Sequence, residues 1–138
     1  AALGYSQLKR LNSFVAKRNK IAKIYNKSLS KYDSIQNPII KKKFFHAFHL
    51  YPLLIDFENL NINKNHFFNQ MFKDGINLQV HYIPVYKQHF LRRYKFNKAL
   101  FPNTEKYYSQ EVSMPIYYSL RNNQIKYVIE KLKKNLKC

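Results

Sequence analysis

Three residues close together in the sequence carry side chains well suited to bind a small polar ligand. They are His81, Tyr82 and Tyr86, which lie on either side of Pro84 after a short alternating segment. Because proline has no backbone N–H for a sheet, we expect a strand to end there and to present one imidazole and two phenols from a rigid turn. These groups offer hydrogen bonds and flat apolar faces. The alternative is a structural role, with the three rings buried at a strand–loop junction.

Other reactive side chains are poorly spaced for catalysis or for a metal site. His46 and His49 have no cysteine or acidic partner that would complete a zinc site. Asp56 and Glu58 fit a solvated strand end better than acid–base catalysis. Cys138 is the only cysteine, so no internal disulfide can form, and the chain suits the reducing cytoplasm. Only two glycines are present, which excludes the glycine-rich phosphate loops.

Composition and charge predict one packed domain over residues 1–138. The chain is 46% hydrophobic and 17% aromatic, which favours a core over disorder. A net charge of +18 makes a free-standing basic module that binds nucleic acid the alternative function. The basic residues are spread along the chain and are mostly lysine, whereas base recognition favours arginine, so we expect no nucleic-acid partner. No apolar run is long enough to span a membrane.

The hydrophobic periodicity predicts the elements that position these residues. They are an amphipathic helix over 3–31, a strand over 46–57, a helix over 64–74, a strand over 76–82, a helical turn and loop over 85–100, a short helix over 104–110, a strand over 112–115 and a helix over 121–136. Asn63 or Asn65 is expected to cap the helix that Gly75 ends. Pro52 predicts an edge strand or a bulge. The order favours an α+β fold in which helices cover a small sheet.

Five segments follow one another in a characteristic order. They are AALGYSQLKRL at 1–11, HLYP at 49–52, the segment from Gly75 to Tyr86 that contains QVHYIPVY, FPNTE at 101–105 and SMPI at 113–116. In order and spacing they resemble motifs of the DegT/StrS-type sugar aminotransferases over essentially the whole chain. QVHYIPVY is most similar to the branch that aminates UDP-4-keto-6-deoxy-N-acetylhexosamines, as in pseudaminic acid synthesis.

The resemblance implies the small C-terminal domain of the aspartate aminotransferase fold (fold type I), cut from a longer enzyme that uses pyridoxal phosphate. Such an enzyme moves an amino group, for example from glutamate, to a 4-keto nucleotide sugar for glycan synthesis, and is a homodimer when complete. The cofactor-binding lysine would lie outside this chain, so no residue here is expected to be catalytic and the chain alone is expected to be inactive. His81 and Tyr82 would line the substrate side of the active site, and Tyr86 would lie near the sugar or the nucleotide. The helix over 3–31 would link the two domains near the dimer interface.

Overall fold

The computed structural model describes residues 1–137, without the side chain of Arg92; Cys138 lies outside the described residues. The helices are α1 (Ala2–Leu8), α2 (Leu11–Leu29), α3 (Lys64–Lys73), α4 (Pro102–Gln110) and α5 (Asn122–Leu136). The strands are β1 (Ile35–Gln36), β2 (Tyr51–Ile55) and β3 (Glu111–Met114), and short 3-10 helices occupy Val85–Lys87 (η1), His89–Tyr94 (η2) and Lys98–Leu100 (η3). The expected α+β class is confirmed.

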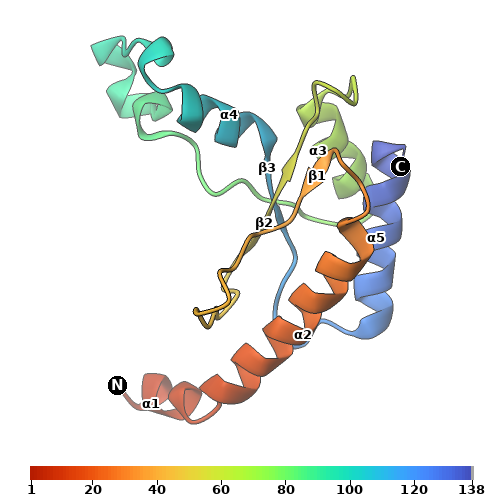
Figure 1. Ribbon diagram of the computed structural model, residues 1–138. Coiled ribbons are helices and arrows are strands. Elements are labelled where there is room, and N and C mark those ends of the chain that lie inside the picture. Colours follow the sequence, from red (N-terminus) through yellow and green to blue (C-terminus); the bar gives the residue numbers. More distant parts are fainter. Residues whose placement is uncertain (138) are drawn as a thin grey trace.

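The three strands form an antiparallel sheet in the order β1-β2-β3. Helices α2, α3 and α5 lie together beside this sheet, and α4 with the 3-10 helices projects away from them (Figure 1). The main hydrophobic core lies between the sheet and these helices. Its largest fully buried side chains include Tyr25, Tyr51, Phe67, Leu53 and Leu132.

Local sequence signals explain where α3 and α5 begin and end. Asn63 accepts a hydrogen bond from the backbone N–H of His66 at 3.0 Å, so it is the cap that the sequence predicts. Gly75 follows α3 with a φ of +75°, a left-handed conformation that glycine adopts without a steric cost. In α5, the apolar residues buried at three- and four-residue spacing are those expected: Ile125, Val128, Ile129, Leu132 and Leu136.

The prediction that Pro52 marks a sheet edge or a bulge is wrong, because β2 is the central strand. Pro52 lies opposite Ser113 of β3. Ser113 uses its own backbone N–H and carbonyl on the other side, where they face Gln79. The nitrogen of Pro52 therefore points toward β1, and β1 pairs only with Leu54 and Ile55. A central strand tolerates this proline because its neighbour is too short to need the missing N–H.

The single helix predicted over 3–31 is also wrong, since the chain bends between α1 and α2. At the bend, Arg10 has a ψ of 0°, and the hydroxyl of Ser13 donates to its carbonyl oxygen at 2.7 Å. The guanidinium of Arg10 lies over the rings of Phe14 and Tyr118, 4.9 and 5.6 Å from their centroids. No residue of α1 is buried, so no packing within the described residues keeps α1 in line with α2.

The predicted strand over 76–82 is reduced to one bridge, between Gln79 and Ser113. In this register the next antiparallel pair would be His81 with Glu111. The N–H of His81 donates instead to the side-chain Oε2 of Glu111 at 2.9 Å, so the ladder stops there. The strand predicted over 46–57 is likewise shorter, and β1 was not predicted. Among residues 1–137 no helix is long and apolar enough to cross a membrane.

Candidate functional site

A chain of hydrogen bonds connects β3 with His81. Glu111 and Ser113 are two residues apart on β3, so their side chains lie on the same face of the strand. The Ser113 hydroxyl donates to Oε1 of Glu111 at 2.6 Å, and Nδ1 of His81 lies 2.7 Å from Oγ of Ser113. Glu111 is completely buried and Ser113 is only 5% exposed. Two buried side chains therefore hold the half-buried imidazole in place.

His81 lines a pocket of about 240 Å³ with mixed polar and apolar lining, called here the His81 pocket. Its other lining residues include His49, Asn77, Gln79 and Tyr117. Imidazole, amide and phenol groups both donate and accept hydrogen bonds. The pocket is therefore suited to a small ligand that carries several hydroxyl groups.

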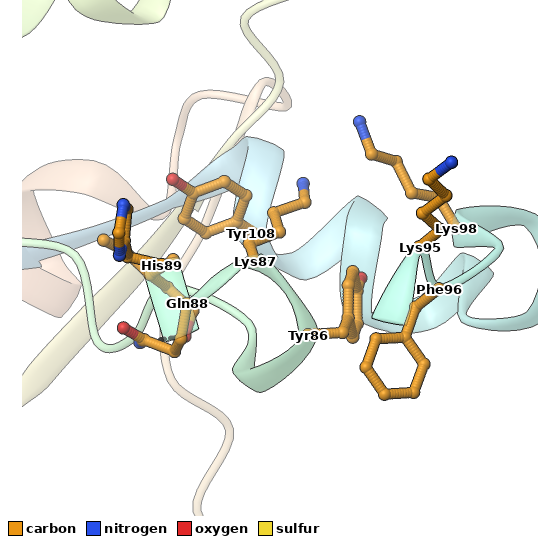
Figure 2. Close-up of a pocket in the computed structure, with 9 residues that line it drawn as sticks. Tyr86, Lys87, Gln88, His89, Lys95, Phe96, Lys98 and Tyr108 are labelled. Atoms are coloured by element: carbon orange, nitrogen blue, oxygen red, sulfur yellow. Dashed lines mark hydrogen bonds between the residues drawn. The ribbon is translucent and has the colours of Figure 1, made fainter. Parts of the chain in front are cut away.

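Tyr86 lines a different pocket of about 610 Å³, called here the Tyr86 pocket (Figure 2). Its lining residues are Ile83, Tyr86, Lys87, Gln88, His89, Lys95, Phe96, Lys98 and Tyr108. Figure 2 shows that the side chains of Lys95 and Lys98 extend from the loop that also carries Phe96. Lysines combined with aromatic rings suit a ligand that has both negative charge and a flat ring.

Tyr86 is fixed by a carboxylate and a second ring. Its hydroxyl donates to Oε1 of Glu105 at 2.6 Å, while Nζ of Lys87 lies 2.6 Å from Oε2 of the same carboxylate. The Tyr86 ring stacks on Phe101, with 4.7 Å between centroids. The hydrogen bond from Lys87, and to a lesser extent the one from Tyr86, lowers the pKa of Glu105. Partial burial, and to a lesser extent the contact with Glu105, raises the pKa of Tyr86 to about 12. Tyr86 is therefore a neutral donor at neutral pH.

The structure does not bring the three predicted site residues into one pocket. His81 and Tyr86 line separate pockets, and Tyr82 lines neither of them. Tyr82 is 70% exposed, and its ring makes an edge contact with His81 at 4.6 Å between centroids. Their expected role in substrate binding stays a prediction.

Four residues that line these two pockets or bond to their lining residues were not predicted as site residues: Lys87, Glu105, Glu111 and Ser113. Glu105 and Ser113 do lie within the FPNTE and SMPI segments. The alternation Glu111-x-Ser113 was also readable as one face of a strand. No local pattern predicts that His81, thirty positions before Glu111 in the chain, faces these two side chains.

The residues that line the two pockets do not by themselves form a site for pyridoxal phosphate. No lysine lines the His81 pocket, where an amine would be needed to bind an aldehyde cofactor. In the Tyr86 pocket, Lys87 is ion-paired with Glu105, and Lys95 and Lys98 are exposed.

Comparisons with known proteins agree with this picture. The model of the DegT/DnrJ/EryC1/StrS aminotransferase family matches residues 1–133. A UDP-4-amino-4,6-dideoxy-N-acetyl-beta-L-altrosamine transaminase of Campylobacter jejuni is 31% identical over 96% of this chain, which spans 37% of that protein.

Solved structures give the same result. One is the aminotransferase PseC of Helicobacter pylori, which is described as involved in the biosynthesis of pseudoaminic acid. It is 28% identical to this chain, and the two superpose with a TM-score of 0.86 over 99% of this chain and 36% of PseC. Spr1654 of Streptococcus pneumoniae, described as a putative sugar aminotransferase and solved in a PLP form, has the same fold. Its TM-score is 0.86 at 23% identity, over 98% of this chain and 34% of its own. The chain thus spans about a third of the length of these relatives, and it belongs to the DegT/DnrJ/EryC1/StrS aminotransferase family.

Proposed function

We propose that this chain is the C-terminal domain of a pyridoxal-phosphate-dependent sugar aminotransferase, and that it forms the substrate-binding wall of the active site. The complete enzyme would transfer an amino group from an amino donor to a 4-keto-6-deoxy nucleotide sugar used in surface glycan synthesis. It would act in the cytoplasm as a homodimer, with α2 near the junction of domains and subunits. The cofactor and the lysine that binds it would belong to the larger N-terminal part.

The family match along nearly the whole chain is the observation that carries this proposal. The sugar class rests on the 31% identical transaminase from Campylobacter jejuni, whose name specifies a UDP-linked 4-amino-4,6-dideoxy sugar. The segment QVHYIPVY, which contains both His81 and Tyr86, supports the same branch.

The two pockets suit chemically different parts of the proposed ligand. The lysines of the Tyr86 pocket would attract the diphosphate, and its aromatic rings would contact the flat base. The His81 pocket, which is smaller and carries imidazole, amide and phenol groups, would receive sugar hydroxyls. In this arrangement the residues of this chain bind and orient the substrate, and Tyr86 remains protonated because its pKa is raised to about 12.

The proposal is tested with the complete reading frame that contains residues 1–138. The purified protein is incubated with glutamate and a UDP-4-keto-6-deoxy-N-acetylhexosamine, and the amino sugar is detected by mass spectrometry. We expect amination by the complete protein and none by residues 1–138 alone. A cofactor-loaded complete protein that aminates no nucleotide-linked keto sugar would contradict the proposal. Tight, sequence-independent binding of duplex DNA at physiological salt would favour the basic-module alternative instead.

A further inference from the structure

We infer that Glu111 and Ser113 are positioning residues that fix the tautomer of His81, with its proton on Nδ1, so that Nε2 is offered to the His81 pocket as a hydrogen-bond acceptor. The three side chains are connected at 2.6 and 2.7 Å, and the two on β3 are buried. Only the identity of the ligand as a sugar rests on the proposed function. The tautomer itself follows from the contacts within this chain.

The number of protons along the chain of hydrogen bonds determines the direction of each bond. A carboxylate accepts and cannot donate, and Glu111 accepts from the backbone N–H of His81 at Oε2 and from Ser113 at Oε1. The Ser113 hydroxyl has one proton, which this bond uses. The 2.7 Å contact between Oγ of Ser113 and Nδ1 of His81 then requires Nδ1 to be the donor. The neutral ring therefore has an unprotonated Nε2.

The direction of this chain depends on Glu111 being ionised. A protonated Glu111 would reverse both hydrogen bonds: it would donate to Ser113, which would donate to Nδ1, and the proton would lie on Nε2. Two observations favour the carboxylate. The first is the backbone N–H of His81, 2.9 Å from Oε2, since a fixed donor binds a carboxylate more strongly than it binds the carbonyl oxygen of a neutral acid. The second is the positive charge of Lys64, which interacts with Glu111.

The free nitrogen determines which ligand groups the pocket selects. Among the side chains that the structure describes, none is hydrogen-bonded to Nε2 of His81, and His81 lines the pocket with Asn77 and Gln79. An unprotonated nitrogen accepts from O–H or N–H donors and repels a bare phosphate oxygen, which is itself only an acceptor. Position and tautomer together therefore select a hydroxyl group, as on a sugar, and leave phosphate to the lysines of the Tyr86 pocket.

The test is long-range ¹H–¹⁵N spectroscopy of the full chain labelled at its histidine rings, at a pH where the rings are neutral. Substitution His81→Gln assigns the signals among the five histidines. We expect the His81 pattern of an Nδ1–H tautomer in the unsubstituted chain. Substitution Ser113→Ala should convert His81 to Nε2–H or to a mixture, and Ser113→Thr, which keeps the hydroxyl, should restore the original pattern.

The matched control is Ser109→Ala, an exposed serine of α4 whose hydroxyl contacts only the carbonyl of Lys106. It should leave the His81 signals unchanged. An Nε2–H pattern in the unsubstituted chain would overturn the inference, and so would an Nδ1–H pattern that survives Ser113→Ala. The spectrum of the unsubstituted chain alone decides between the two tautomers, so the inference can be tested even if a variant fails to fold. None of these readouts depends on aminotransferase activity, so the proposed function can fail separately.

Discussion

Tyr86 and Glu105 are joined by a hydrogen bond of 2.6 Å between residues 19 positions apart in the chain. The bond connects η1 with α4, and the Lys87 ammonium binds the second oxygen of the same carboxylate. The segment that contains η2 and η3 lies between these two elements and forms much of the Tyr86 pocket. One carboxylate therefore closes the loop around this pocket.

The first prediction concerns acid opening of this loop. Lys87, and to a lesser extent Tyr86, lowers the pKa of Glu105 in the folded chain. The ionised carboxylate therefore stabilises the closed loop above pH 4.5, the ordinary pKa of a glutamate, and this stabilisation is lost as the pH falls through the lower pKa of the folded state. We expect proteolysis within residues 88–100 to accelerate below about pH 4.5, measured by limited digestion with pepsin.

The Glu105→Gln variant should show fast digestion at neutral pH as well, measured there with trypsin. The matched control is Glu130→Gln, a substitution at an exposed glutamate of α5. If the control loosens the loop equally, or if Glu105→Gln leaves digestion unchanged, the carboxylate does not hold the loop. At the alkaline end, the contribution of Tyr86 should be complete below pH 10 and lost as the pH rises through about 12.

The second prediction concerns the lysines of the Tyr86 pocket. Substitution Lys98→Ala should weaken the binding of UDP by roughly 1.5- to 5-fold, since an exposed ion contact contributes about 0.2–1 kcal/mol. Isothermal titration at low and physiological salt measures this, and the variant should also depend less on salt. The control Lys20→Ala removes an exposed lysine of α2 outside the pocket. Equal weakening by both variants would indicate only a general effect of net charge.

The third prediction concerns the glycine after α3. Substitution Gly75→Ala should lower the free energy of unfolding by about 1–2 kcal/mol, the cost of a left-handed conformation for a residue with a Cβ. The new methyl group meets no atom within 4 Å, so the loss would come from the backbone alone. Urea unfolding followed by circular dichroism measures it. The control Gly4→Ala, in α1 and equally unhindered, should not destabilise the chain; equal losses would mean that φ is not the cause.

The fourth prediction concerns the apolar side chains of α1 and the start of α2. Leu3, Tyr5, Leu8 and Leu11 are 46–76% exposed, whereas Ile21 and Tyr25 of α2 are fully buried. Apolar groups gathered in this way favour association, and the charge of +18 opposes it until salt screens the repulsion. Sedimentation of the 138-residue chain should show self-association at high salt. Substitution Leu8→Asp should reduce it and Lys9→Asp should not; a monomer at both salt levels would contradict this.

The sequence predicted α3, α4 and α5 because their signals are local. Apolar spacing, Asn63 and Gly75 all lie within the elements they define or next to them. The broken strand after Gln79 was missed because its cause is distant, and one of the contacts of Arg10 at the bend is distant as well. Arg10 contacts Tyr118, and His81 gives its N–H to the side chain of Glu111. His81 and Tyr86 were expected in one site because they are neighbours in sequence, yet the turn between them places them in different pockets.

The buried hydroxyl of Tyr25 in α2 donates to the carbonyl oxygen of Pro115, 90 residues further along the chain. At a synthesis rate of about 5–20 residues per second, roughly 5–18 s pass between the synthesis of Tyr25 and that of Pro115. During this time the apolar face of α2 has neither β3 nor α5 to cover it. The elements that complete the core around α2 are therefore synthesised well after it, and until then its buried face lacks these partners.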